Sequence, residues 1–186
     1  METELFPELA KAPDSPQVAG CSAMSCSAVL SDDRIYRYEL WRRWSGGDYC
    51  CFVGLNPSTA DESADDPTIR RCIGFAKAWG YGALCMLNLF AFRATDPADM
   101  KREPEPVGAD NDATLARLTE GAGIVIAAWG VHGTHRDRAS EVMASLPSLH
   151  CLGLTKDGHP RHPLYLPKTS EPLPLNVGGA AASEED

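Results

Sequence analysis

A short polar turn follows the first strongly apolar run of the sequence, and its residue types suit a ligand site. The run YCCFVGL ends in Gly54-Leu55-Asn56-Pro57-Ser58. The glycine lets the backbone approach a ligand closely, and the proline biases Asn56 toward an extended conformation. The Asn56 amide offers a donor and an acceptor, so it can orient a water molecule. The alternative interpretation is a strand-ending turn in which Asn56 caps the local backbone.

A second polar residue, Asn88, interrupts an apolar run in the stretch MLNLFAFRATDP. An amide among large apolar side chains is costly unless it is hydrogen-bonded. Asn88 therefore either bonds neighbouring backbone or faces a ligand. A nucleobase edge suits an amide because both present a donor beside an acceptor. In the same stretch, Arg93 suits a phosphate or carboxylate, with a surface salt bridge as the alternative.

Two His-Pro steps stiffen the segment 158–165, GHPRHPLY. Its histidines are suited to donate a hydrogen bond to a developing oxyanion. Leu164 and Tyr165 can pack on a base or wedge beside it. The alternative is a proline-stiffened surface loop, which we favour for His159.

Carboxylates, cysteines and further histidines are the remaining candidates for chemistry. The acidic stretch Asp61, Glu62, Asp65 and Asp66 could hold Mg²⁺ for phosphoryl transfer. A solvated loop ending in a helix N-cap is the better explanation. The pairs Cys21–Cys26 and His132–His135 lack further ligands at metal-binding spacing. We therefore expect no metal and no cofactor.

The elements that must position these residues alternate along the chain. Buried strands are predicted over 49–55, 83–90, 123–128 and 150–154, and a half-exposed edge strand over 36–41. Helices are predicted over 66–79, 110–120 and 136–146, the first capped by Asp66-Pro67 and stopped by Gly80. This alternation predicts a three-layer α/β/α domain with a central, mostly parallel four-stranded sheet. Ligands bind such sheets beyond the carboxyl ends of the strands, where Asn56, Asn88 to Arg93 and Trp129 follow.

Composition and charge set the domain limits and the class of partner. We expect a flexible leader over 1–25, one domain over 26–168 and a disordered acidic tail over 169–186. The net charge of −9 lies largely in the two ends, which leaves the middle nearly neutral and compatible with nucleic acid. No apolar run is long enough to span a membrane, and the N-terminus lacks signal-peptide features. We expect a cytoplasmic protein without a membrane partner.

The order of motifs from 31 to 165 resembles the bacterial and phage family DUF1643. The matching text is Tyr36-Arg37-Tyr38, LNPSTAD, DDPTIRR, WGYG, NLFAFRATDP, AWG and PRHPLYL. The resemblance covers about three quarters of the chain, and the family has no established chemistry.

More distantly, the layout is similar to the uracil-DNA-glycosylase superfamily, which implies a parallel-sheet α/β/α fold with its site at the strand ends. Gly54-Leu55-Asn56-Pro57 resembles the superfamily motif G-x-N-P-G, and His162-Pro163 resembles its late H-P-S motif. The resemblance implies that Asn56 positions the attacking water, that His162 stabilises the departing base, and that Asn88 reads the base edge. Phe75 or Phe90 would supply a stacking ring. Ser58 and Leu164 depart from the Gly and Ser of the two motifs.

Three hypotheses for function follow. The first is a nucleobase-recognising N-glycosidic hydrolase that acts on a flipped or single-stranded nucleotide. The second is a non-catalytic module that binds a nucleotide or nucleic acid, and the third is a metal-dependent nucleotide hydrolase. Asn56 and His162 are the predicted catalytic residues. The predicted substrate-binding residues are Gly54, Leu55, Pro57, Ser58, Asn88, Phe90, Arg93, Trp129, Leu164 and Tyr165.

Overall fold

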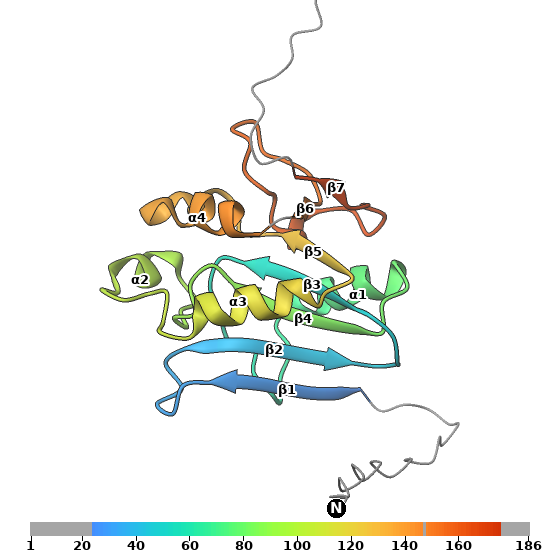
Figure 1. Ribbon diagram of the computed structural model, residues 1–186, viewed down its shortest axis with the longest axis horizontal. Coiled ribbons are helices and arrows are strands. Elements are labelled where there is room, and N and C mark those ends of the chain that lie inside the picture. Colours follow the sequence, from blue (N-terminus) through green and yellow to red (C-terminus); the bar gives the residue numbers. More distant parts are fainter. Residues whose placement is uncertain (1–23, 147, 176–186) are drawn as a thin grey trace, which may run out of the picture.

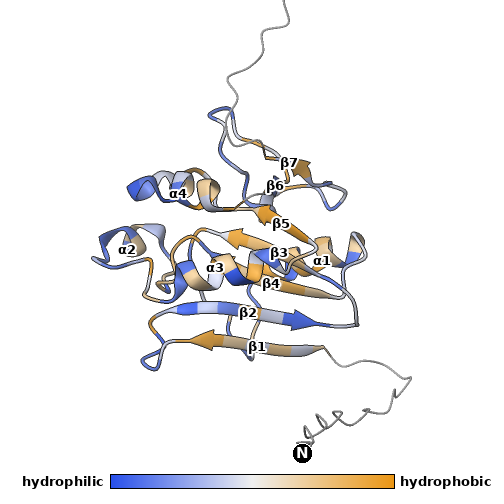
Figure 2. Cartoon of the chain, in the orientation of Figure 1, coloured by the Kyte–Doolittle hydropathy of each residue, from blue (hydrophilic) through white to orange (hydrophobic). Residues whose placement is uncertain are grey.

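The most apolar segments of the chain form the parallel centre of a sheet. The computed structural model of the protein describes residues 24–146 and 148–175. Continuous apolar runs favour strands that are buried on both faces, and Figure 2 shows hydrophobic colour along three of the central strands, at residues 49–54, 83–88 and 124–127. In spatial order they are β4 (Ala83–Asn88), β3 (Tyr49–Gly54), β5 (Ile124–Ala127) and β6 (His150–Cys151), each parallel to its neighbour.

Antiparallel strands extend this centre on both sides, so the sheet is larger and more mixed than the four strands predicted. The full order is β1-β2-β4-β3-β5-β6-β7, seven strands in all (Figure 1). β1 (Ser25–Leu30) and β2 (Arg37–Arg43) are added next to β4, and β7 (Leu173–Pro174) is added next to β6. The α/β class is confirmed, whereas the predicted strand number is wrong.

β2 differs most from its prediction as a half-exposed edge strand. β1 pairs along its whole length, with Ser25 opposite Arg43 and Leu30 opposite Arg37, so β2 is an interior strand. Arg37, which the alternation assigns to solvent, is buried instead, and so is Arg42, which lies just beyond the predicted strand. The sequence pattern misled because SCSAVL, which forms β1, adjoins a polar segment expected to be a flexible leader.

The helix after β3 begins and ends where the sequence predicts. α1 (Pro67–Ala78) is capped by Asp66, whose side chain accepts a hydrogen bond from the backbone N–H of Ile69 at 2.8 Å. Proline at the first helical position has no N–H to leave unpaired there. The chain leaves the helix through Gly80 with a φ of 85°, a backbone conformation that glycine adopts without strain.

Helices cover both faces of the sheet. α1 packs on one face around Phe52, Phe75 and Ile126. The other face is covered by α2 (Pro97–Arg102), α3 (Asn111–Glu120) and α4 (Arg138–Ser145), which bury Met100, Leu115 and Val142 against it. α2 lies within a stretch for which no helix was predicted. Short 3-10 helices, η1 (Val131–Asp137) and η2 (Pro163–Tyr165), follow β5 and β6 along the chain.

The chain ends bear on the predicted limits of the domain. Ser25 already belongs to β1, and the predicted leader before residue 24 lies outside the described residues. The predicted disordered tail begins too early, because Leu173 and Pro174 pair with β6 and the N–H of Leu175 donates to the carbonyl of Leu149 at 2.8 Å. Residues 176–186 are not described. Within the described residues, no helix combines the length and the apolar character needed to cross a membrane.

Candidate functional site

A pocket of about 730 Å³ opens at the carboxyl ends of the parallel strands. Its walls come from the segments that follow β3, β4, β5 and β6 and from the start of α1. This is the end at which sheets of this type bind ligands. The structure brings most predicted site residues together here: Gly54, Leu55, Asn56, Ser58, Asn88, Trp129, His162, Leu164 and Tyr165.

Three predicted residues do not line this pocket. Phe90 is fully buried in the core on the other side of the sheet. The centroid of its ring lies 5.7 Å from that of His135. Arg93 donates from Nη1 to the carbonyl of Arg34 at 3.2 Å. Pro57 has a structural role, since its carbonyl accepts the N–H of Ala94 at 2.9 Å. The sequence could not separate these residues from the pocket, because the orientation of side chains beyond a strand end depends on the path of the chain.

The side chain of Asn56 is held by backbone carbonyls of the segments that follow β3 and β4. Its Nδ2 donates to the carbonyl of Pro57 at 3.1 Å and to that of Ala94 at 2.8 Å. These two bonds use both amide hydrogens. The Oδ1 atom is therefore the part of Asn56 that remains for a ligand or a water molecule, and it can only accept hydrogen bonds.

Asn88 is the last residue of β4 and is 2% exposed. Its backbone carbonyl accepts a hydrogen bond from the side chain of Asn111 in α3 at 3.1 Å. Its Oδ1 accepts a hydrogen bond from Nη2 of Arg37 at 3.2 Å. The sequence predicted that Asn88 either bonds neighbouring backbone or faces a ligand. Its oxygen instead bonds the side chain of Arg37.

Arg37 is a pocket residue that the sequence analysis missed. It is 2% exposed, and its Nη1 donates to the carbonyl of Ala60 at 2.7 Å. Its Nε has no partner within the described part of the chain. Burial lowers the pKa of Arg37 to about 10, and the negative charge of Asp66 opposes this shift. The guanidinium is therefore still charged at neutral pH, and no salt bridge of the described residues includes it. A buried charge without an ionic partner is uncommon away from functional sites.

His162 enters the pocket from the loop after β6 with one ring nitrogen already bonded. Its Nδ1 accepts the N–H of Leu164 at 3.3 Å and so caps η2. Burial lowers the pKa of His162 from 6.5, with a smaller opposing effect of Asp66. Both observations favour the neutral ring at pH 7. A neutral ring that accepts at Nδ1 carries its proton on Nε2, which makes Nε2 a donor.

The rim of the pocket combines exposed apolar and cationic groups. Leu164 and Tyr165 are 38% and 79% exposed, so both present apolar surface to solvent beside the pocket. The ring centroid of Tyr165 lies 5.8 Å from that of His162. Arg161 lines the same pocket, and so does His132, whose Nδ1 lies 3.1 Å from Nζ of Lys101.

The acidic stretch between β3 and α1 is bound to protein groups rather than gathered into one cluster. Oδ1 of Asp61 accepts the N–H groups of Ser63 and Ala64, and its pKa is lowered to about 2, chiefly by the bond from the Ser63 hydroxyl. Asp65 pairs with Nε of Arg42 at 2.7 Å. Asp66, which caps α1, is the acid of this stretch that lines the pocket. Over residues 24–146 and 148–175, no group of three His, Cys, Asp or Glu side chains is arranged to hold a metal ion.

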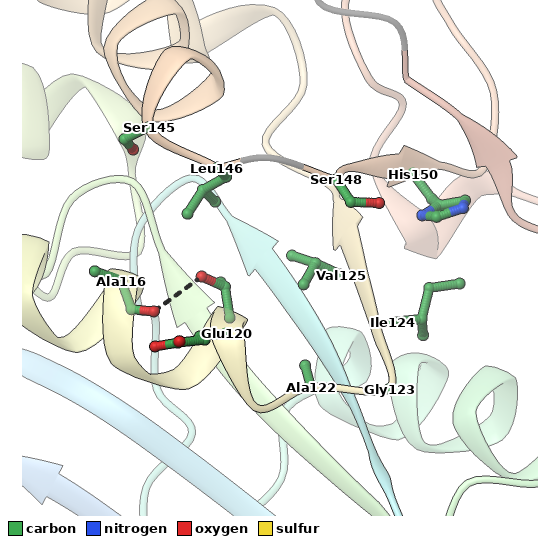
Figure 3. Close-up of a pocket in the computed structure, with 11 residues that line it drawn as sticks. Ala116, Glu120, Ala122, Gly123, Ile124, Val125, Ser145, Leu146, Ser148 and His150 are labelled. Atoms are coloured by element: carbon green, nitrogen blue, oxygen red, sulfur yellow. Dashed lines mark hydrogen bonds between the residues drawn. The ribbon is translucent and has the colours of Figure 1, made fainter.

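A second hollow of about 470 Å³ lies at the opposite ends of the strands (Figure 3). It is bordered by Glu120 at the end of α3, Gly123 before β5 and His150 in β6. Figure 3 shows mainly small and apolar side chains around it, with the side chains of Ser148 and His150 on one side. None of the predicted site residues borders this hollow.

Comparisons with known proteins agree with the motifs in and around the pocket. A family model described as "Protein of unknown function (DUF1643)" matches residues 37–164, more than half of the chain. No curated protein and no solved structure matches the chain. The matched region contains Arg37, Asn56, Asn88 and His162. The chain belongs to the DUF1643 family.

Proposed function

We propose that the pocket binds a nucleobase and that the protein hydrolyses an N-glycosidic bond of a flipped or single-stranded nucleotide. The observation that carries this proposal is the convergence of Asn56, Asn88 and His162, from three separate segments, on one pocket at the carboxyl ends of the strands. The pocket volume lies within the range of small-molecule sites. A base inside a duplex stack cannot reach such a pocket unless it is extruded.

The reaction divides into the departure of the base and the addition of water. The bond between the sugar C1′ and the base nitrogen breaks, and its electron pair stays on the base. The Nε2–H group of His162 donates a hydrogen bond to the base as its negative charge grows. The oxygen of a water molecule then bonds to C1′, and the proton it loses balances the base anion after release.

Two pocket residues suit the water and the sugar. Oδ1 of Asn56 can accept a hydrogen bond from the water, because both Nδ2 hydrogens already bind carbonyl oxygens. The Asp66 carboxylate, which uses Oδ1 to cap α1, adds a negative charge to the same pocket. A negative charge favours a sugar that gains cationic character as the base leaves.

The same arrangement supports a distant relationship to the uracil-DNA-glycosylase superfamily, which we include in the proposal. The G-x-N-P-like segment follows β3, and the His-Pro step lies in the loop after β6. Both reach one pocket at the end of a parallel sheet.

We also propose a cytoplasmic location. The buried free thiols are those expected in a reducing compartment, and they belong to Cys50, Cys51, Cys72, Cys85 and Cys151.

One observation favours the non-catalytic alternative, a module that binds a base without cleaving it. The two hydrogen bonds from Nδ2 of Asn56 join the segments after β3 and β4. A residue with this structural role is useful in a rigid binding pocket even if no water is activated beside it.

The deciding experiment measures base release from single- and double-stranded oligonucleotides that carry uracil, hydroxymethyluracil, hypoxanthine or normal bases. We expect release by the wild type and at least a 100-fold loss in His162→Gln. His159→Gln is the matched control, because His159 lies in the same loop and does not border the pocket. Binding of an oligonucleotide without release would favour the binding module, and neither binding nor release would refute the proposal.

A further inference from the structure

The contact between Arg37 and Asn88 fixes which end of the Asn88 amide faces the ligand. Nη1 of Arg37 donates to the carbonyl of Ala60 at 2.7 Å and Nη2 donates to Oδ1 of Asn88 at 3.2 Å. A guanidinium has donors and no acceptor, so the amide oxygen must face it. If the Asn88 amide were rotated by half a turn, two donors would oppose each other beside a buried positive charge.

The nitrogen end of the amide is consequently directed away from Arg37, toward the backbone at Gly54. A Cβ atom placed on Gly54, which lines the pocket, would lie 2.9 Å from Nδ2 of Asn88. Among the hydrogen bonds of the described residues, none is donated by this Nδ2. The Asn88 carbonyl is itself held by Asn111 at 3.1 Å, so the residue has little freedom to turn.

We propose that Arg37 is a positioning residue that determines base specificity: it holds Asn88 as a hydrogen-bond donor, so the pocket selects bases with an oxo group and rejects those with an amino group there. This inference rests on the base pocket proposed above. Uracil, thymine, hypoxanthine and guanine present a carbonyl oxygen at the corresponding edge. Cytosine and adenine present an amino group, which would leave two donors facing each other without an acceptor.

Burial and charge make this discrimination strong. A donor left unpaired in a buried site loses its interaction with water and gains nothing in return. Sites built to bond one polar group reject analogues that cannot make the bond by large factors. The charge of Arg37 also polarises the Asn88 amide through Oδ1, which strengthens Nδ2 as a donor. We expect the wild type to bind uracil at least tenfold more tightly than cytosine, and hypoxanthine at least tenfold more tightly than adenine.

The test measures binding of four free bases, which contain no glycosidic bond to be cleaved. The matched pairs are uracil against cytosine and hypoxanthine against adenine, titrated by calorimetry or ligand-observed NMR. Arg37→Met removes the donors that orient Asn88, so we expect the preference to fall to within about threefold. Arg37→Lys keeps N–H donors and a positive charge, and should retain the preference.

A second variant inverts the expected result and does not depend on removing the buried arginine. In Asn88→Asp, one carboxylate oxygen stays bonded to Arg37 while the other presents an acceptor to the ligand. Cytosine and adenine should then bind at least tenfold better than their oxo counterparts. Circular dichroism of each variant verifies that it is folded before the affinities are compared.

The outcomes separate this inference from the proposed function. Equal binding of oxo and amino bases by the wild type would overturn the specificity while leaving a base pocket in place. An equal loss of affinity for all four bases in Arg37→Met, without inversion in Asn88→Asp, would show a merely structural role for Arg37 and would also overturn it. No binding of any base by the folded wild type would overturn the proposed pocket and this inference together.

Discussion

Three polar side chains of the main pocket are already bonded to protein groups before a ligand enters. Nδ2 of Asn56, Oδ1 of Asn88 and Nδ1 of His162 each have a protein partner. In each case the opposite polar atom of the same side chain remains for the ligand. Side chains fixed in this way lose little conformational freedom on binding, which favours affinity and defined geometry.

At the residue scale, the first prediction concerns the close approach at Gly54. A Cβ atom there would lie 2.7 Å from Cε of Met86 and 2.9 Å from Nδ2 of Asn88. The methionine end can move, whereas the amide is held by Arg37. We expect Gly54→Ala to weaken base binding about tenfold and to lower the free energy of unfolding by about 1–2 kcal/mol.

Gly74 provides the control for this substitution. It lies in α1, and a Cβ atom there meets nothing within 4 Å among the described residues. Gly74→Ala should raise the free energy of unfolding by about 1 kcal/mol through helix propensity and leave binding unchanged. Titration of a base against both variants checks the prediction, and equal binding by the two would contradict it.

The second residue-scale prediction concerns the pH dependence of His162. Its pKa is lowered from 6.5 by burial, so the folded protein favours the neutral ring. Below pH 6.5 the unfolded chain therefore binds more protons than the folded protein. The stability due to neutral His162 is lost as the pH falls through the lowered pKa. Protonation of Nδ1 also breaks the bond from the N–H of Leu164.

We therefore expect the wild type to lose more stability than His162→Gln between pH 7.5 and pH 5. Urea denaturation of both proteins across this range measures the difference. The comparison cancels the contribution of His135, whose pKa is also lowered by burial. Parallel pH profiles of the two proteins would contradict the assignment of a neutral, bonded His162.

At the scale of elements, β2 anchors the loop that leads from β3 into α1. Arg42, which is 1% exposed, pairs with Asp65 and donates to the carbonyls of Asp61 and Ala64 at 2.6 and 3.2 Å. Arg37 at the other end of β2 binds the carbonyl of Ala60. Two buried arginines of one strand therefore fix the conformation of the loop between β3 and α1, which ends at Asp66 in the pocket.

This anchoring predicts that substitutions of two neighbouring arginines lower the free energy of unfolding by unequal amounts. Arg42→Met should lower the free energy of unfolding by about 3 kcal/mol, because it leaves buried carbonyl groups and the Asp65 carboxylate without their donor. Arg43→Met should cost less than about 1 kcal/mol, since Arg43 is exposed and lies 4.0 Å over the ring of Trp41. Urea denaturation of the two variants tests this, and similar costs would argue against the anchoring role.

At the scale of the whole molecule, one sheet separates two apolar cores that must form together. Cys51 and Cys85 lie in the core covered by α3 and α4, while Cys50 and Cys72 lie in the core covered by α1. β3, β4 and β5 each contribute side chains to both cores because successive residues point to opposite faces. Opening either core disturbs strands on which the other depends, so we expect cooperative unfolding of the sheet.

The cysteines report this cooperativity directly. Burial raises the pKa of the thiols of Cys50, Cys72 and Cys85, and the thiolate is the reactive form. Pulse alkylation followed by peptide mass spectrometry should modify exposed Cys26 at once. The central-strand cysteines and Cys72 should react together, at the urea concentration of global unfolding. Earlier modification of Cys72 alone would show that the α1 core opens independently.

Much of the local structure could be predicted because it depends on residues close in sequence. The apolar runs of β3, β4 and β5 and the Asp66-Pro67 start of α1 show their roles in a few consecutive residues. β1, α2 and β7 were missed because their stability comes from partners elsewhere in the fold. The apolar but short segment SCSAVL becomes a strand only when β2 is available to pair with it.

The sequence by itself determined the α/β class, the parallel centre and the segments at and after the strands that carry Asn56, Asn88 and His162, since these follow from local apolar pattern and turn residues. Only the tertiary structure decided which of the side chains near those ends share a pocket. Arg37 reaches Asn88 because β2 pairs antiparallel to β4, and Phe90 points away because the chain beyond β4 presents it to the opposite face. Such contacts depend on strand order, and strand order is set by the packing of the entire sheet.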